Sequence, residues 1–266
     1  RLIFRGYDLS EMIDKVISED RFGFEEIAFL LLTGKLPDKN ELDEFNMTLS
    51  DSRELPDNFF EDMILKAPSP DIMNKMARSI LALYSYDIEP DAPTPEHEVD
   101  TAISLIAKMP VIMVCAYETK RRFYTGESMI MHPLIKGQST AENILSTIRI
   151  DRNFTHDEAK LLDLMLMLHA EHGGGNNSTF ACRVLTSSGT DPYSAYAAAV
   201  GSLKGPRHGG ANRKVIEMQE LIKSSVKDWD NDDELADFLK RIMKKEAGDG
   251  SGLIYGMGHA VYTLSD

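Results

Sequence analysis

The sequence predicts an all-α protein of about a dozen helices. Apolar side chains recur every three or four residues along most of the chain, which is the repeat of an amphipathic helix. Alternation of apolar and polar residues, the mark of a half-buried strand, is nearly absent. Of the 266 residues, 42% are hydrophobic and 27% are charged, which is ordinary for a globular protein and excludes a wholly disordered chain.

In the first half of the chain, capping residues, glycines and prolines mark the helix ends. Ser10 is expected to cap a first helix, and Gly34 to end a second. Thr94-Pro95-Glu96 forms a helix start, and Pro110 should kink the long helix that follows because it removes a backbone donor. The further helices expected here are Phe24–Leu32, Asp38–Ser50, Pro56–Lys66, Pro70–Tyr86 and 94 to about 122.

The second half continues the helical pattern after a loop at Tyr124–Thr140. Thr155 and Glu158 have the spacing of a capping box. The expected helices are Ala141–Ile148, Thr155–Ala170, Ser178–Leu185, Pro192–Leu203, Ala211–Ser224 and Asp232–Glu246. The glycine-bracketed segment Gly205–Gly210 is the candidate domain boundary.

Charge and composition limit the class of partner. The formal net charge of −14 argues against nucleic acid or an anionic membrane as the main partner. The most apolar stretch, Met109–Tyr117, has nine residues, fewer than the ~18 that a membrane span needs. Cys115 and Cys182 lie in apolar or helical surroundings, as free thiols of a cytoplasmic protein do. The chain opens on Arg1 without a signal peptide, so we expect that its true N-terminus has been removed.

Three segments combine histidine with glycine at expected helix ends. They are Leu168–Thr179 (LHAEHGGGNNST), Leu203–Asn212 (LKGPRHGGAN) and Gly248–Tyr262 (GDGSGLIYGMGHAVY). Glycine lets the backbone approach a ligand closely, and a helix N-terminus beside it favours an anion. These segments are the candidate functional site.

Other kinds of site fit these residues less well. His169 and His172 could share a helical face, but H-x-E-H matches no zinc-enzyme motif, and we expect no bound metal. The G-x-G at Gly256 and Gly258 lacks the third glycine and the βαβ pattern of a dinucleotide fold. No G-x-S-x-G or Cys–His signature of a nucleophile occurs. His169 is interpreted as structural, and the histidines taken as ordinary surface side chains are His97, His132 and His156.

At these segments the sequence resembles the citrate synthase family, including 2-methylcitrate synthases. LHAEHGGGNNSTF resembles the family's oxaloacetate-binding segment, and LKGPRHGGAN its first catalytic-histidine segment. GMGHAVYTLSD resembles most of the signature around the second catalytic histidine. Phe4–Tyr7 and Phe24–Pro37 are similar to the family's N-terminal region. The resemblance covers essentially the whole chain.

The resemblance implies an acyltransferase that condenses acetyl-CoA with oxaloacetate and hydrolyses the thioester to citrate and CoA. Acetyl-CoA would be a co-substrate, with no permanently bound cofactor. His208 would hydrogen-bond the thioester carbonyl, and His259 would polarise the ketone of oxaloacetate. His172 and Asn176 would hold oxaloacetate, and Ser178 would orient His208. The backbone expected near the adenine end of CoA is that of Leu253, Ile254, Gly256, Met257 and Gly258.

The chemistry of enol formation agrees with this assignment. The methyl hydrogens of a thioester are very weakly acidic, so removing one requires stabilisation of the developing enolate oxygen. A neutral imidazole can donate that hydrogen bond, and the positive end of a helix disfavours the imidazolium. His208 directly precedes the helix start expected at Gly209–Asn212. This placement suits an electrophile better than a general base.

The chain also departs from the family pattern. The family's catalytic aspartate and its later arginines would lie beyond Asp266, so we expect a C-terminally truncated chain that is inactive by itself. Arg213 stands where the family often has an acid, and Gly173 replaces a common glutamate. Thr263 stands where some members carry a basic residue, which weakens the expectation of a phosphate contact there.

The resemblance further implies a large helical domain at residues 1–208 and the start of a smaller helical domain at 209–266. Such proteins are homodimers, and the apolar helices between Met73 and Tyr117 are candidates for the interface. Two alternative functions remain open. One is a 2-methylcitrate synthase that uses propionyl-CoA, and the other is a non-catalytic helical binding or assembly protein of the same fold.

Overall fold

The structure is a computed structural model that describes residues 2–171 and 173–258. Eleven α-helices dominate the described residues, which confirms the all-α prediction. The chain divides into two compact units, Arg1–Gly201 and Ser202–Asp266. The division falls within the ninth helix, and the expected domain boundary at residue 208 lies a few residues further along the chain.

The order of elements follows the expected order closely, with one hairpin added at the N-terminal end and short helical turns named η1, η2 and η3. η1 and η3 are π-helical turns and η2 is a 3₁₀ turn. The elements are β1 (Ile3–Phe4), β2 (Tyr7–Asp8), α1 (Leu9–Ser18), α2 (Phe24–Thr33), α3 (Lys39–Asp51), η1 (Phe60–Leu65), α4 (Ile72–Leu83), η2 (Tyr84–Tyr86), α5 (Pro95–Lys120), η3 (Arg121–Thr125), α6 (Thr140–Ile148), α7 (His156–His169), α8 (Asn177–Thr186), α9 (Pro192–Leu203), α10 (Ala211–Ser225) and α11 (Asp232–Met243).

Most of the capping residues predicted from the sequence cap their helices in the structure, but one prediction is wrong. Thr94 caps α5, and Thr155 with Glu158 forms the predicted capping box at α7. At α1, however, the Asp8 carboxylate accepts a hydrogen bond from the Ser10 amide at 2.9 Å. The prediction of Ser10 as the cap is therefore wrong, because a capping side chain must precede the first turn of its helix.

The expected helix at residues 56–66 is shorter than predicted and is wound as the π-helical turn η1. The side chain of Lys75, on α4, reaches the carbonyl of Met63 at 3.0 Å and also that of Ala67. These bonds satisfy carbonyls at the end of η1, where a helix leaves them without internal partners. Lys75 is 1% exposed, and this burial lowers the pKa of its ammonium to about 8.

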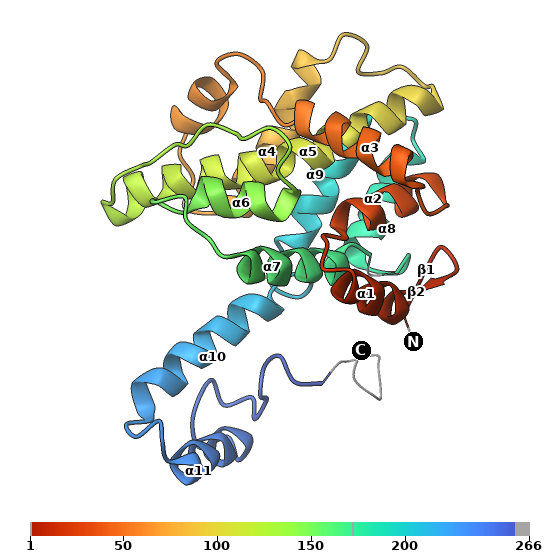
Figure 1. Ribbon diagram of the computed structural model, residues 1–266. Coiled ribbons are helices and arrows are strands. Elements are labelled where there is room, and N and C mark those ends of the chain that lie inside the picture. Colours follow the sequence, from red (N-terminus) through yellow and green to blue (C-terminus); the bar gives the residue numbers. More distant parts are fainter. Residues whose placement is uncertain (1, 172, 259–266) are drawn as a thin grey trace. The chain divides into compact units, whose positions relative to one another are not determined.

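α5 is the central helix of the first unit and packs against α3, α4, α6 and η1 (Figure 1). Its Leu105, Ile112 and Cys115 belong to the largest buried cluster, together with Phe59 and Ile80. By length and composition the helical stretch 95–125 could also cross a membrane, with a window of mean hydropathy 1.7. A search for uninterrupted apolar runs misses this window because charged residues divide it. Of this window, 39% is buried within the structure.

α1, α2 and α7 meet at Gly23. Its amide donates to the Asp163 carboxylate at 2.6 Å, and the Phe24 amide donates to the same carboxylate at 3.2 Å. A side chain of α7 thereby caps the N-terminus of α2. Burial raises the pKa of Asp163 to about 6. A Cβ at Gly23 would lie 2.7 Å from both Met167 and Val16, so this position admits only glycine without movement of its neighbours.

The second unit has its own small core. α10 and α11 pack around the buried side chains Val226, Phe238 and Ile242. Ile254, from the glycine-rich segment after α11, joins this cluster. The core therefore holds one end of the segment that the sequence assigns to CoA.

Replacing Gly23 by alanine should destabilise the first unit. The added methyl group would enter a filled, fully buried junction, and overpacking of this kind typically costs about 1–3 kcal/mol. Urea unfolding followed by far-UV circular dichroism measures the loss. Gly201→Ala is the control, because no heavy atom lies within 4 Å of the position and alanine favours the helix. Equal stability of the two variants would contradict the tight junction.

Candidate active site

Asn176 organises the glycine-rich segment between α7 and α8. Its Oδ1 accepts the Thr179 amide at 3.0 Å, which makes it the N-cap of α8. Its Nδ2 donates to the Gly173 carbonyl at 2.7 Å and to Thr179 Oγ1 at 2.8 Å. The Gly173 amide in turn donates to Glu171 at 2.5 Å. The side chain expected to hold a substrate thus also fixes the turn that would present it.

Ser178 lies in the first turn of α8. Its hydroxyl donates to the Ala199 carbonyl of α9 at 2.9 Å. The bond ties the start of α8 to the helix that runs toward the second histidine segment. The expected role of Ser178, to orient His208, is a separate interaction that this bond does not test.

His208 lies in a tight turn between α9 and α10. Its amide and that of Gly209 both donate to the Gly205 carbonyl at 3.0 Å. A Cβ at Gly209 would lie 1.9 Å from the carbonyl oxygen of Leu203. The obstacle is backbone, which cannot rotate away as a side chain can. Glycine is therefore required directly after His208.

α10 begins immediately beyond this turn, as the sequence predicts. Gly210 is its N-cap, and no side chain caps the helix. A Cβ at Gly210 would lie 2.3 Å from the Pro206 carbonyl oxygen, so this second glycine is also required by close backbone packing. The first amides of α10 and the positive end of its dipole follow His208 directly in the chain.

The segment expected to approach CoA forms a turn with two left-handed glycines, Gly256 (φ 87°) and Gly258 (φ 78°). A Cβ at Gly256 would lie 3.2 Å from Val215 of α10, so the turn packs closely on that helix. Leu253 and Met257 are 57% and 77% exposed. The partly buried Ile254 anchors the turn to the core of the second unit, while these neighbours stay accessible to a ligand.

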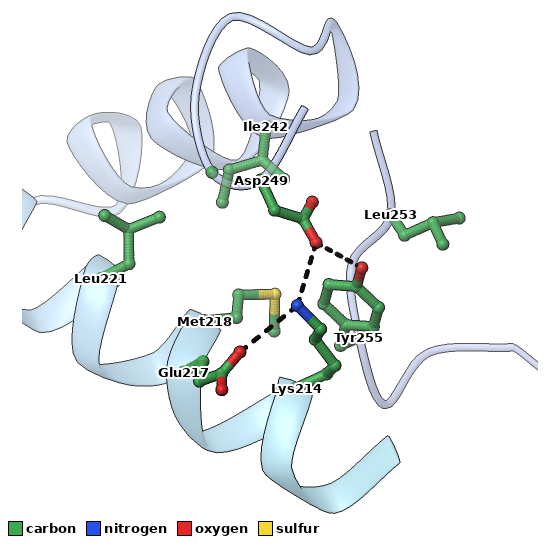
Figure 2. A pocket seen from close by; sticks show the side chains of 9 residues that line it. Lys214, Glu217, Met218, Leu221, Ile242, Asp249, Leu253 and Tyr255 are labelled. Atoms are coloured by element: carbon green, nitrogen blue, oxygen red, sulfur yellow. Dashed lines mark hydrogen bonds and ion pairs between the residues drawn. The ribbon is translucent and has the colours of Figure 1, made fainter. Parts of the chain in front are cut away.

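A hollow of about 370 Å³, including space open to solvent, lies beside this turn within the second unit (Figure 2). One wall is apolar and the rim is charged. The lining residues are Lys214, Glu217, Met218, Leu221, Ile242, Gly248, Asp249, Leu253 and Tyr255.

The charged rim is a network around Lys214 of α10. Its ammonium lies 3.3 Å from Glu217 and 3.5 Å from Asp249, and the Tyr255 hydroxyl donates to Asp249 at 2.6 Å. The hydrogen bond from Tyr255 is the main cause that holds the pKa of Asp249 far below its ordinary value. Glu217 is also paired with Arg213 at 2.8 Å, so two cations and two carboxylates balance in this network. Sequence reasoning missed these residues, although an aspartate within the glycine run GDGSG signals a structured turn.

The expected site residues fall in both compact units. Asn176 and Ser178 belong to the first, and His208 and residues 253–258 belong to the second. His172 and His259 lie outside the described residues. In the part of the chain that the structure describes, no three His, Cys, Asp or Glu side chains gather closely enough to hold a metal ion.

Comparison with known proteins covers the whole chain. Residues 1–266 match the family described as "Citrate synthase, C-terminal domain". The chain is 32% identical to 2-methylcitrate synthase 1 of Corynebacterium glutamicum, over 100% of this chain and 64% of that protein. It is 29% identical to the citrate synthase of the same organism, over 100% of this chain and 57% of that protein. The chain thus spans about three fifths of the length of these curated relatives.

A solved structure has the same fold. The crystal structure of citrate synthase from Pyrobaculum aerophilum superposes with a TM-score of 0.77 at 28% identity, covering 97% of this chain and 60% of that one. The sequence match and the fold therefore agree. The chain belongs to the citrate synthase family, which confirms the resemblance found in the sequence.

Replacing Gly209 by alanine should open the His208 turn. Its Cβ would collide with a backbone oxygen, so the hydrogen bonds to the Gly205 carbonyl must break. Hydrogen exchange at residues 203–210 should rise markedly. Gly205→Ala is the control, because its Cβ would lie 3.2 Å from the Ser202 oxygen and needs only a small shift. Unchanged exchange in Gly209→Ala would show that the turn does not need this glycine.

Proposed function

We propose that the protein carrying this chain is a citrate synthase-type acyltransferase. It joins acetyl-CoA to oxaloacetate and hydrolyses the thioester, releasing citrate and CoA. The observation that carries the proposal is the turn at Gly205–Gly210, in which close backbone packing requires glycines after His208 and a helix starts at once. Membership of the citrate synthase family supports the choice of reaction.

In this proposal His208 stabilises the enol of acetyl-CoA. Its imidazole donates a hydrogen bond to the thioester oxygen as a methyl proton leaves and negative charge develops there. The neighbouring start of α10 attracts the developing negative charge. A fixed donor of this kind contributes about 2.7–4 kcal/mol in comparable oxyanion sites.

The other expected residues bind or activate the substrates. His172 and Asn176 hold oxaloacetate, and His259 polarises its ketone. Asn176 has both amide N–H groups engaged within its own turn, so its contribution comes through the turn and the remaining lone pair of Oδ1. The turn at Leu253–Gly258 receives the adenine end of CoA. On the rim of the neighbouring hollow, the carboxylates of Glu217 and Asp249 can accept hydrogen bonds from the adenine amino group.

A second candidate function is 2-methylcitrate synthesis from propionyl-CoA. The relative at 32% identity carries that name, whereas the relative at 29% is a citrate synthase. The two substrates differ by one methylene, which an apolar pocket typically distinguishes by only about 10–200-fold.

Release of free CoA decides between these functions. The gene product that carries this chain is assayed with oxaloacetate and either acetyl-CoA or propionyl-CoA, using a thiol reagent as the readout. We expect a higher kcat/KM with acetyl-CoA. A preference for propionyl-CoA would establish the second function. Binding of oxaloacetate without turnover of either thioester would establish a non-catalytic protein of the same fold.

His208→Ala should lower kcat by about 10²–10³, the usual cost of removing one oxyanion donor. The KM for oxaloacetate should change much less, because His208 is assigned to the other substrate. His169→Ala is the matched control: that ring bonds the Met165 carbonyl of its own helix at 2.7 Å and should leave kcat unchanged. An unaltered kcat in His208→Ala would remove His208 from the mechanism.

We also propose that the protein is a homodimer that associates through α7 and α8. Leu161, Met165 and Leu168 follow one another at helical spacing on α7 and are 62%, 48% and 49% exposed. Phe180 and Val184 do the same on α8, at 66% and 49%. A two-fold interface presents the same patch from both copies. The apolar faces of α4 and α5, the interface expected from sequence, contribute to the buried cluster within the first unit.

Phe180→Asp should therefore shift the protein toward monomer in sedimentation velocity. A carboxylate in the centre of an apolar interface loses its hydration without gaining a partner. Ile88→Asp is the control, since Ile88 is 97% exposed but lies in the loop after η2. A wild-type protein that sediments as a monomer, or equal effects of the two changes, would contradict the proposed interface.

A further inference from the structure

One face of α7 is attached along its length to the turn between α1 and α2, residues 19–23. The attached side chains His156, Lys160, Asp163 and Met167 lie on successive turns of the helix. The Asp20 carboxylate contacts the first two, at 3.2 Å from His156 Nε2 and 2.5 Å from Lys160 Nζ. The α1–α2 turn thus contacts α7 from its first turn to its last.

Asp163 makes the buried contact in this attachment. Its side chain is enclosed, with the residue 1% exposed, and its two oxygens accept the Gly23 and Phe24 amides at 2.6 Å and 3.2 Å. A buried carboxylate is costly unless hydrogen bonds compensate for its lost hydration. Here both oxygens have amide donors, and the same bonds start α2. The contact therefore joins α7 to α2, and neither helix can shift along the other without breaking these hydrogen bonds.

The turn that receives Asp163 is itself firmly defined. Asp20 has a left-handed backbone, φ 52°, which a residue other than glycine keeps only when its surroundings impose it. Gly23 has no room for a Cβ, because Met167 and Val16 fill that space. Met167 is completely buried. The turn is therefore a rigid reference point for α7.

α7 transmits this position to the glycine-rich segment. The helix ends at His169, less than two turns beyond Asp163, and the Ala170 amide still bonds the Met167 carbonyl at 3.3 Å. Glu171–Asn176 follows at once, and its turn closes through Asn176. Six residues of helix span only about 9 Å, so a shift or rotation of α7 at Asp163 moves the start of this segment almost undiminished.

We propose that Asp163 is a positioning residue that sets the oxaloacetate-binding segment after α7 by anchoring this helix to the α1–α2 turn. The inference rests on the proposed function, which assigns that segment to oxaloacetate. Asp163 does not touch the substrate in this account. It acts through α7, and its loss misplaces the segment while His208 and the thioester subsite stay intact.

Steady-state kinetics of Asp163→Ala and Asp163→Asn test the proposal. Misplacement of a binding group by about 1 Å can cost 10²-fold, and we expect Asp163→Ala to raise the KM for oxaloacetate at least tenfold. The KM for acetyl-CoA should stay within twofold. Asp163→Asn should fall between wild type and alanine, because its one amide oxygen can replace only one of the two acceptors. If Asp163→Ala does not fold, the KM of Asp163→Asn for oxaloacetate tests the proposal in its place.

Glu118→Gln is the matched control. Glu118 is also 1% exposed, and it accepts the Ile130 amide and an Arg121 N–H, each at 2.9 Å. This change disturbs an equally buried carboxylate at the end of α5, away from the α1–α2 turn. We expect it to lower the urea midpoint as Asp163→Asn does while leaving the KM for oxaloacetate within twofold. Equal KM changes in the two variants would overturn the proposal, because general destabilisation would then suffice.

Hydrogen exchange separates this proposal from the proposed function. Exchange at residues 166–176 should rise in Asp163→Asn and not in Glu118→Gln, whatever reaction the protein catalyses. Unchanged exchange at these residues would overturn the positioning role. A wild-type protein that turns over neither acyl-CoA would instead overturn the proposed function, while the exchange result still decides whether Asp163 positions the segment.

Discussion

Buried carboxylates that accept amide hydrogen bonds at the starts of other helices connect the first unit. Asp163 of α7 caps α2, and Glu25 of α2 accepts the Thr140 amide at the start of α6 at 2.7 Å. Each bond offsets the cost of burying a charge and satisfies a helix amide that has no partner within its own helix. These hydrogen bonds thereby fix the position and the rotation of the three helices. Apolar packing alone is less directional and would fix them less strictly.

This rigidity matters because the candidate substrate residues lie at helix starts or on the turns that precede them. Asn176 and Ser178 follow α7, and their geometry depends on where that helix ends. In the second unit, the His208 turn relies on a different device, namely glycines packed against carbonyl oxygens. Both devices place a polar side chain at a helix start, where free amides favour anionic groups.

Much of the fold and the location of the candidate site could be predicted from the sequence. The helical repeat, the capping box at Thr155 and the helix start after His208 are local features, and the structure confirms them. The cap of α1 was misassigned to Ser10 by two residues. Lys75, Asp163 and Tyr255 were not found at all, because isolated polar residues in amphipathic helices or glycine-rich loops look like solvent-exposed ones. The motif segments located the candidate site, yet they did not show which residues support it.

The sequence by itself determined the helices and the segments that carry chemistry. Local preferences decide these: apolar spacing, caps, and glycine where the backbone must turn sharply. Only the tertiary structure decided that Asp163 meets Gly23, separated from it by 140 positions, and that Gly209 lies against the Leu203 carbonyl. Such contacts depend on which helix faces pack together. The free energy of that packing comes from burial across the whole unit, which no local pattern of residues encodes.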